Sequence, residues 1–474
     1  MNNQTTIFDI LYSKKKITKP IRLIEFFAGY GSQALALKYL GVEFEHWKIC
    51  EWAIKSIQAY KDIHFTDDNE DYSILNNLSY EKLIDILYNY GISQNYNEPM
   101  TLEQIKRLGE KQVRKIFNNI VATHNLVNIQ KVKGYNLEIT DTNKYEYIMT
   151  YSFPCQDLSL AGKGKGMSDK STRSGMLWEV ERILTECHEL GEMPQILLME
   201  NVPQVHSEDN VEDFNKWKDR LEELGYKNYF QDLIASDYGI PQTRNRCFMV
   251  SLLGDYSYTF PKPVPLKLKL KDLLEENVDE KYYLSEKQIQ DIKSWNAYEK
   301  PLENMEKVDK SNISPTLTTR SGAYAAGMIL VKNNTSKGYL EATNGDGIDI
   351  SSRMEHHRGT VQKDKIQTLT TSCGNDRGVV INEPKILDDR DKGINGITIN
   401  DKCPTQRASR NGLKILQTDL KIRKLTPREC FRLMGVKDED FDKAKVNQSD
   451  NSLYHLAGDS IVVNVLMAIF KELI

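Results

Sequence analysis

The sequence predicts an α/β fold: a doubly wound sheet with helices on both faces, joined to a smaller domain of short β-strands. Residues 21–27 form an apolar run that enters a glycine turn, and apolar residues follow that turn at helical spacing. Strand-like and helix-like segments then alternate as far as about residue 260. Because 474 residues exceed what one ordinary core supports, two domains are expected.

The composition describes a water-soluble globular protein, with 40% hydrophobic and 27% charged residues. No apolar run approaches the length that crosses a bilayer, and the first six residues lack the pattern of a signal peptide. Seven scattered cysteines without a CxxC pair argue against a disulfide framework and against a zinc site. We therefore expect a reduced, cytoplasmic protein with no membrane partner and no metal.

The first strand, glycine turn and helix form the opening of a doubly wound unit, which places a ligand beyond the carboxyl end of the strand. The full dinucleotide spacing of glycines is absent. A second strand, residues 47–50, ends in Glu51-Trp52. An acid at this position can hold a ribose and the neighbouring aromatic ring can cover an adenine, although a helix-start acid beside a core tryptophan explains the pair equally well.

Residues 62–130 interrupt the alternation with helical patterns, one of which begins with a capping box at Thr101 and Gln104. The alternation then resumes with predicted strands at 145–151, 196–199, 227–233 and 246–253, and a helix at 211–223. Beyond Pro261 short β-type runs follow one another, and an amphipathic helix entered through Asp459-Ser460 ends the chain. We expect a first domain over 1–260, a second over 261–422, and a segment over 423–474 that returns to the first.

Phe153-Pro154-Cys155-Gln156-Asp157 places a cysteine directly after a proline at the end of an apolar run. The proline restricts the backbone there, and the glycine- and lysine-rich residues 162–166 supply positive charge that favours a reactive thiolate. A cysteine alone is more often a small buried hydrophobe. The surrounding motifs favour the nucleophile.

Two further motifs accompany this cysteine. Glu200-Asn201-Val202 follows the strand at 196–199, and Gln242-Thr243-Arg244-Asn245-Arg246 precedes the strand at 246–253. Alternation along an extended segment aims Gln242, Arg244 and Arg246 to one side. A thiolate can add to an electron-poor ring carbon, a protonated carboxyl can donate to a ring nitrogen, and guanidinium groups can hold a ring oxygen and a phosphate.

In these motifs, and in Leu425-Thr426-Pro427-Arg428-Glu429-Cys430-Phe431-Arg432-Leu433-Met434-Gly435, the chain resembles the C5-cytosine DNA methyltransferases. The resemblance implies a Rossmann-like, S-adenosylmethionine-dependent methyltransferase fold with a mixed sheet and a β-rich target recognition domain. It also implies methyl transfer from S-adenosylmethionine to C5 of a cytosine flipped out of a specific site in double-stranded DNA. The expected protein acts as a monomer on DNA near the nucleoid, with a cognate restriction endonuclease as a further partner.

The resemblance also assigns roles to individual residues. The implied catalytic residues are Cys155, Glu200, Arg244 and Arg246. The implied cofactor-binding residues are Phe27, Gly29, Tyr30, Gly31, Glu51, Trp52, Glu138, Ile139, Pro154 and Ser460. The expected DNA-binding residues are Gln156, Ser159, Lys163, Lys165, Arg173, Gln242, Arg320, Arg407 and Arg410.

The three arginines of the second domain are chosen from the sequence itself and not from the resemblance. Residues 402–432 hold nine Lys or Arg against two acids, although the whole chain has a net charge of -4. Residues 314–322 recur loosely at 366–374 and faintly at 403–412, with Thr, Ser and Arg side chains that can reach phosphates and base edges. A set of ordinary β-turns in a small sheet is the alternative interpretation of this repeat.

Two departures from the family pattern are visible. Gly458-Asp459-Ser460 stands where the family has Gly-Asn-Ser, and the Asp is expected to keep a helix-capping role while Ser460 makes the contact. Glu138-Ile139 stands at the expected end of the third strand, where the family tends to have an Asp, and the longer acid would shift the adenine contact onto Ile139. Two alternatives stay open: an RNA cytosine-5 methyltransferase with the same core, and a catalytically silent DNA-binding relative.

Overall fold

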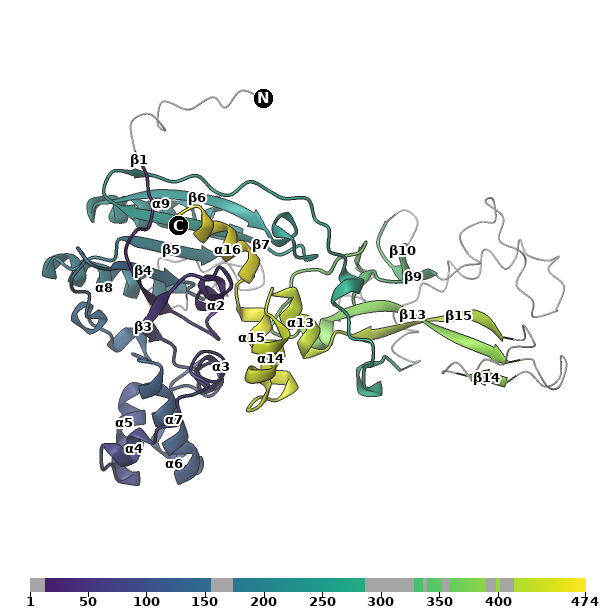
Figure 1. The fold of residues 1–474 in the computed structure, drawn as a ribbon, viewed down its shortest axis with the longest axis horizontal. Helices are drawn as coiled ribbons and strands as arrows, with labels where there is room; N and C mark the ends of the chain where they lie inside the picture. Colours follow the sequence, from purple (N-terminus) through teal and green to yellow (C-terminus); the bar gives the residue numbers. More distant parts are fainter. Residues whose placement is uncertain are drawn as a thin grey trace. The chain divides into compact units, whose positions relative to one another are not determined.

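The computed structural model describes residues 13–154, 174–285, 328–335, 339–351, 359–388, 398–400 and 413–474 (Figure 1). The chain divides into two compact units. Unit 1 comprises residues 1–240, 244–266 and 431–474, and unit 2 comprises residues 241–243 and 267–430. The chain therefore changes unit at 266/267 and 430/431, where the sequence analysis expected 260/261 and 422/423. The short passage of residues 241–243 through unit 2 was not expected.

Unit 1 contains a six-stranded sheet in the order β3-β2-β4-β5-β7-β6. Its strands are β2 (Ile21–Phe26), β3 (Phe44–Cys50), β4 (Glu146–Tyr151), β5 (Ile196–Asn201), β6 (Tyr226–Ile234) and β7 (Asn245–Leu253). All neighbours are parallel except β7, which runs antiparallel to both β5 and β6. Every residue of β4 and β5 is buried, as expected for central parallel strands covered on both faces. The predicted mixed α/β sheet is confirmed.

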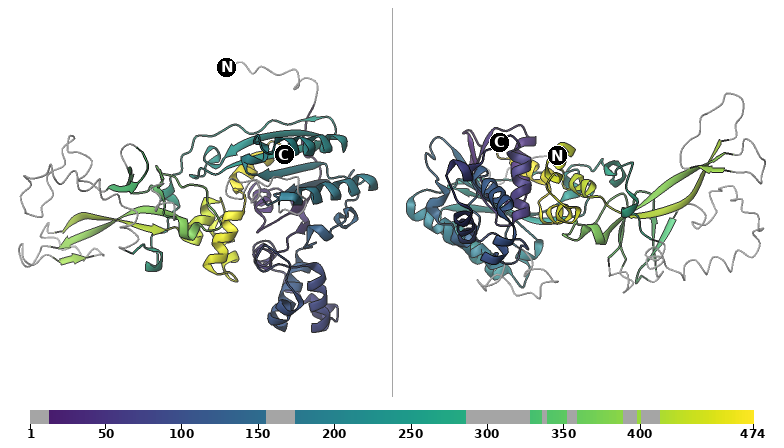
Figure 2. Two further views of the ribbon diagram at one scale, coloured as in Figure 1. Left: turned by 180° about the vertical axis from the view of Figure 1, so that it is seen from behind. Right: turned by 90° about the horizontal axis from the view of Figure 1, so that it is seen from below.

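Helices cover both faces of this sheet (Figures 1 and 2). On one face, α8 (Leu177–Leu190) and α9 (Val211–Glu223) contribute Leu184 and Trp217 to a core shared with Ile24 and Phe26 of β2. Glu25 alternates with those two residues, and its carboxylate accepts a hydrogen bond from the Ala34 amide of α2 (Ser32–Tyr39). Thus α2 lies on the opposite face, where it packs against α16 (Val463–Lys471).

The segment expected to be a helical insertion forms a small bundle at one end of unit 1 (Figure 1). Its helices are α4 (Tyr72–Leu75), α5 (Tyr80–Tyr90), α6 (Leu102–Arg107) and α7 (Glu110–Ala122), which follow α3 (Ile54–His64). They enclose a separate core around Leu83, Leu87 and Ile116. The capping box predicted at Thr101 and Gln104 begins α6.

The amphipathic helix predicted at the end of the chain is present as α16. α14 (Asp438–Lys445) and α15 (Asp450–Asp459) precede α16, and the chain breaks at Ser460 between α15 and α16. Asp459 therefore ends one helix and does not cap the next, whose N-cap is Val462. The stretch Asp450–Lys471 is long and apolar enough to cross a membrane. However, 72% of its most apolar 18-residue segment is buried inside the protein, as in the core helices of a soluble protein.

Unit 2 is built mainly of antiparallel strands. They are β9 (Met328–Lys332), β10 (Tyr339–Thr343), β11 (Gly347–Asp349), β12 (Val361–Gln362), β13 (Arg377–Asp388), β14 (Thr398–Asn400) and β15 (Leu413–Lys424). The long pair β13–β15 is the centre of this unit. At its base Arg423 is almost fully buried and binds both carboxylate oxygens of Glu429, at 2.6 and 2.8 Å. Glu429 lies in α13 (Pro427–Leu433), so this ion pair anchors the helix to the sheet.

Candidate active site

Glu200 and Arg246 lie side by side at the carboxyl edge of the sheet. Glu200 is near the end of β5 and pairs in register with Phe248 of β7, so that the start of β7 lies beside the end of β5. Arg246 therefore approaches Glu200, and its Nε lies 3.1 Å from Glu200 Oε1. The sequence predicted that these two side chains would converge, and the structure brings them together.

The Glu200 carboxyl is only 8% exposed. Burial raises its pKa, while the charges of Arg246 and Arg244 oppose the shift and the charge of Asp459 adds to it. The result is a carboxyl that holds a proton more readily than an exposed glutamate does. In its protonated form such a group can donate a hydrogen bond to a ring nitrogen.

Asn201, which the sequence analysis did not select as a site residue, fixes the chain immediately before the predicted nucleophile. Its buried side-chain amide donates to the carbonyl oxygen of Phe153 at 3.0 Å. Its own Oδ1 accepts from the Val202 amide at 2.8 Å. Phe153 is buried in the main core and Pro154 follows it. The position of Asn201 directly after Glu200 was the one available signal in the sequence.

The nucleophile and the loop after it lie outside the described residues. This applies to the catalytic candidate Cys155 and to the DNA-binding candidates Gln156, Ser159, Lys163, Lys165 and Arg173. It applies equally to Arg320, Arg407 and Arg410 of the second domain. The roles of these residues stay predictions.

Arg244 bonds the segment between α15 and α16, and its expected contact with a phosphate stays a prediction. Its side chain is buried, and Nη2 donates to the carbonyl oxygens of Gly458 at 3.1 Å and Ser460 at 2.7 Å. In this structure Arg244 therefore holds the break between α15 and α16. The hydroxyl of Ser460 in turn lies 2.9 Å from the hydroxyl of Tyr30.

Gln242 also departs from its expected place. It belongs to unit 2, its side chain is fully buried, and its Oε1 accepts a hydrogen bond from the Leu369 amide at 3.1 Å. A buried side chain presents no surface to DNA, so Gln242 is a packing residue of unit 2 in this structure. Alternation along 242–246 predicted that Gln242 faces the same side as Arg244 and Arg246. That prediction holds only if the whole segment lies in one sheet.

The glycine turn after β2 is shaped by residues with positive φ. Phe27, Gly29 and Gly31 have φ of 57°, 56° and 82°. A Cβ at Gly31 would lie 2.4 Å from His64 Nε2, so only glycine fits there. A Cβ at Gly29 would meet no atom within 4 Å, so the turn is open on that side. The Tyr30 ring points into the protein and stacks on Phe431 with a centroid distance of 5.2 Å.

Glu51 closes the turn from the end of β3. Its Oε2 accepts from the Gly29 amide at 3.0 Å, and its Oε1 accepts from the Ala53 amide at 2.8 Å. Burial raises the Glu51 pKa to about 7 against these hydrogen bonds. Trp52 is half-buried and packs against the helical core of residues such as Leu83. An acid with free lone pairs, a partly exposed indole and an open glycine turn fit the adenosine part of a cofactor.

Glu138 and Ile139 do not lie at the end of a strand. They follow a short 3₁₀ helix, η2 (Gly134–Leu137), and Glu138 takes a left-handed conformation with φ of 48°. The Glu138 side chain is 60% exposed and pairs with Lys48 Nζ at 2.9 Å, while Ile139 is buried in the main core. In this described part of the chain no strand ends at Glu138. The 3₁₀ helix η2 precedes it, and the next strand, β4, begins at Glu146.

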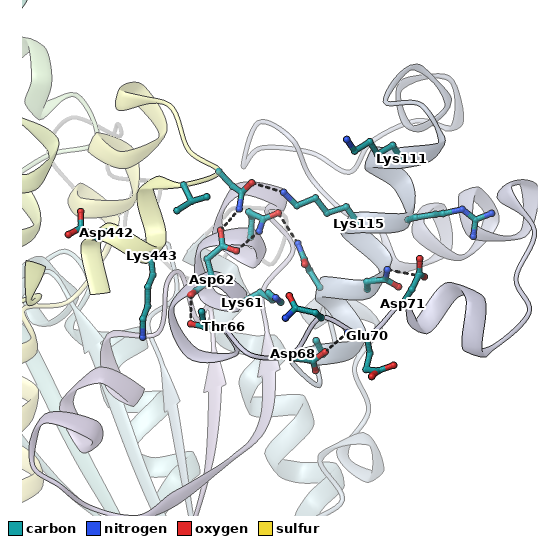
Figure 3. Close-up of a pocket in the computed structure, with 18 residues that line it drawn as sticks. Lys61, Asp62, Thr66, Asp68, Glu70, Asp71, Lys111, Lys115, Asp442 and Lys443 are labelled. Carbon is teal, nitrogen blue, oxygen red and sulfur yellow. Dashed lines mark hydrogen bonds between the residues drawn. The ribbon is translucent and has the colours of Figure 1, made fainter. Parts of the chain in front are cut away.

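A separate hollow of about 780 Å³ lies between α3, α7 and the end of α14 (Figure 3). Its charged lining is balanced, with Lys61, Lys111, Arg114, Lys115 and Lys443 against Asp62, Asp68, Glu70, Asp71 and Asp442. Lys115 donates to Asn447 at 2.8 Å and Asn447 donates to Asp62 at 2.9 Å. These bonds connect the helical bundle to the C-terminal segment, and none of the predicted site residues lines the hollow.

Comparisons with known proteins are consistent along the chain. The family model for C-5 cytosine-specific DNA methylase matches residues 103–474. Type II methyltransferase M2.ScrFI of Lactococcus lactis subsp. cremoris is 31% identical over 460 residues, which cover 96% of this chain and 99% of that protein. Orphan methyltransferase M.SssI of Spiroplasma monobiae is 38% identical over 272 residues, or 56% of this chain and 68% of that protein.

Among solved structures, the Entamoeba histolytica methyltransferase EhMeth covers 96% of this chain and 98% of its own. The TM-score is 0.51 at 14% sequence identity. This likeness supports the fold of the chain.

Proposed function

Because this chain belongs to the C-5 cytosine-specific DNA methylase family, it is a DNA (cytosine-5)-methyltransferase that uses S-adenosylmethionine, and we propose that Cys155, Glu200 and Arg246 carry out its chemistry. The observation that supports this assignment is the pair of Glu200 and Arg246, 3.1 Å apart. It lies beside the peptide that Asn201 holds directly before Pro154 and Cys155.

The proposed reaction starts at C6 of the cytosine. The C5 carbon is too weak a nucleophile until the Cys155 thiolate adds to C6. Glu200 then donates a proton or a hydrogen bond to N3, and Arg246 holds O2, so that electron density moves to C5. S-adenosylmethionine supplies the electrophilic methyl group. Loss of the C5 proton and elimination of Cys155 complete the exchange.

The cofactor is proposed to bind against the open side of the Gly29 turn. Glu51 would accept hydrogen bonds from the ribose hydroxyls, since its two oxygens keep lone pairs beyond those used by Gly29 and Ala53. Trp52 would cover the adenine. Ser460 and Tyr30, which bond to each other, would shape the turn from behind, and Arg244 would hold Ser460 in place.

DNA binding is proposed to involve both units. The target base must leave the helix to reach Cys155, and the lysine-rich loop over residues 159–173 is the candidate to close over it. Unit 2 is the candidate reader of the target sequence, because a duplex reader needs side chains that reach into the major groove. We propose a monomer on DNA in the cytoplasm, with a cognate restriction endonuclease as a further partner.

The direct test is methyl transfer from labelled S-adenosylmethionine to duplex DNA and, separately, to transfer RNA. We expect label in DNA at C5 of cytosine and none in RNA. Bisulfite-type sequencing of DNA from cells that express the protein would identify the target sequence. Transfer to RNA alone would overturn the assignment of unit 2 as a duplex reader.

A further inference from the structure

Three side chains that commonly bind metal ions meet on the sheet beside the active-site strands. They are His206 from the 3₁₀ helix η5 (Pro203–His206), Asp232 from β6 and Cys247 from β7. Their ligand atoms all lie within 4.8 Å of one another. Among the residues that the structure describes, this is the one group of three or more such side chains with that spacing.

The sheet topology brings these residues together. Asp232 and Cys247 face each other directly across the antiparallel pair β6–β7. Cys247 also pairs with Asn201 at the end of β5. The chain leaves β5 there and turns through η5, which returns His206 to the same edge, where its Nε2 lies 2.9 Å from Asp232 Oδ1. His206, Asp232 and Cys247 are 26 and 15 positions apart, and these intervals form no metal-binding motif. The sequence analysis, which looked for a CxxC pair, therefore could not find this group.

The exposure of the three side chains suits a bound ion. His206 and Asp232 are 30% and 32% exposed, which leaves a path from solvent and room for a water ligand. Cys247 is fully buried beneath them and places its sulfur at the inner side of the group. Phe214 and Phe230 pack against each other and against His206, with ring centroids 6.1 and 5.7 Å from the imidazole, so the imidazole has an apolar neighbour cluster on that side.

We propose that His206, Asp232 and Cys247 form a binding site for a single Zn²⁺ ion with its fourth position open to water. One nitrogen, one oxygen and one sulfur donor suit zinc, which is commonly held by three protein ligands and one water. On binding, the Cys247 thiol releases its proton to solvent and a sulfur–zinc bond replaces the S–H bond. Small side-chain movements bring ligand atoms within 4.8 Å to the shorter separations of a tetrahedral site.

The ion would connect three segments that also carry the active site. Cys247 follows Arg246 on β7, and its partner Asn201 follows Glu200 on β5. Zinc would therefore clamp β6, β7 and the exit of β5 at the edge where Glu200 and Arg246 meet. The proposal concerns binding alone and does not depend on which residues transfer the methyl group.

The test uses the full-length protein after treatment with a chelator. Calorimetric titration with Zn²⁺ should give one ion per chain, and Co²⁺ should give a thiolate-to-metal charge-transfer band. His206→Ala and Asp232→Asn should weaken binding at least about tenfold, which corresponds to roughly 1.4 kcal/mol. Both side chains are partly exposed, so these variants should fold. Cys247→Ala should abolish the cobalt band.

Two control variants test whether another cysteine binds the Zn²⁺ ion. Cys187→Ala removes a buried cysteine of α8 and should leave Zn²⁺ affinity unchanged. Cys155→Ser removes the proposed nucleophile and should also retain binding. If binding is absent, is lost in Cys155→Ser, or is unaffected by both His206→Ala and Asp232→Asn, the proposal is wrong and the group is a His–Asp hydrogen bond over a core cysteine.

Discussion

Arg246 Nε lies 3.1 Å from Glu200 Oε1, and the two residues come from strands that run in opposite directions. The reversal matters because the start of β7 thereby meets the carboxyl end of β5, where the ligand of a doubly wound fold is expected. Burial of Glu200 favours its protonated form and the guanidinium of Arg246 opposes it. The net effect is a raised pKa, so the protonated form of the Glu200 carboxyl is favoured relative to an exposed glutamate.

Glu200→Gln should lower the rate of methyl transfer by about 10²–10⁴-fold, the usual contribution of a general acid. Glu200 must be protonated to donate to N3, so the wild-type rate should fall as pH rises through its raised pKa. The glutamine variant should lack this decline. Single-turnover rates measured against pH test both points. Glu103→Gln, which removes an exposed carboxylate of α6, should keep the wild-type profile.

Cys155→Ser should bind DNA and S-adenosylmethionine and transfer no methyl group, because a hydroxyl is a far weaker nucleophile than a thiolate at neutral pH. Labelled methyl transfer and gel-shift binding measure the two properties. Turnover within about tenfold of wild type would end the assignment of Cys155 as the nucleophile.

Trp52→Ala should weaken S-adenosylmethionine binding by roughly 1 to 3 kcal/mol if the indole stacks on the adenine, as judged from other aromatic–base contacts. Calorimetry gives the affinity. Trp52 also packs on the helical core, so Leu108→Ala, which disturbs that same core, serves as the control. Equal losses in both variants would mean that Trp52 acts through packing alone.

Glu25→Gln should stabilise the protein at pH 8. Glu25 is fully buried, and burial raises its pKa from 4.5 to about 7 although Tyr60 and Ala34 donate to it. A raised carboxyl pKa contributes stability below the unfolded value that is lost as pH rises through the folded value. Wild-type stability should therefore fall by about 3 kcal/mol between pH 4.5 and pH 8 relative to the variant.

Urea unfolding at a series of pH values measures this difference. The glutamine can keep the hydrogen bonds, since its amide can donate to the Tyr60 hydroxyl, which then donates to His46 Nδ1, 2.8 Å away. Glu45→Gln removes a half-exposed carboxylate of β3 and is the control. Parallel pH curves for wild type and Glu25→Gln would contradict the prediction.

Alanine at Arg320, Arg407 or Arg410 should cost about 1 to 3 kcal/mol of DNA binding and relax the target at one base position, if that arginine contacts a base. An arginine that contacts only phosphate would instead weaken all sequences alike and reduce the salt dependence. Binding assays against variant sites separate the two outcomes. Lys271→Ala, an exposed change in the same unit, controls for lost charge. If all three variants leave affinity and site unchanged, unit 2 reads DNA elsewhere or not at all.

The sequence by itself determined most of the local elements and the places of Glu51, Glu200 and Arg246 along them, while Cys155 lies outside the described residues. Apolar periodicity located the strands of the six-stranded sheet to within a few residues, because one buried strand or helix face leaves its own repeat in the chain. The glycine turn and the ends of β3 and β5 were equally readable, since φ requirements and strand direction are local properties, whereas the strand end expected at Glu138 was not found. Glu51 and Glu200 therefore lie at the sheet edge where they were expected.

Tertiary structure alone decided which residues meet across the chain. The bond from Asn201 to Phe153, the bonds from Arg244 to Ser460 and the burial of Gln242 depend on partners 48 to 216 residues away, and the reversal of β7 depends on its antiparallel pairing with β5 and β6. Strand pairing sets these contacts, and pairing depends on the register between distant segments, which no local pattern encodes.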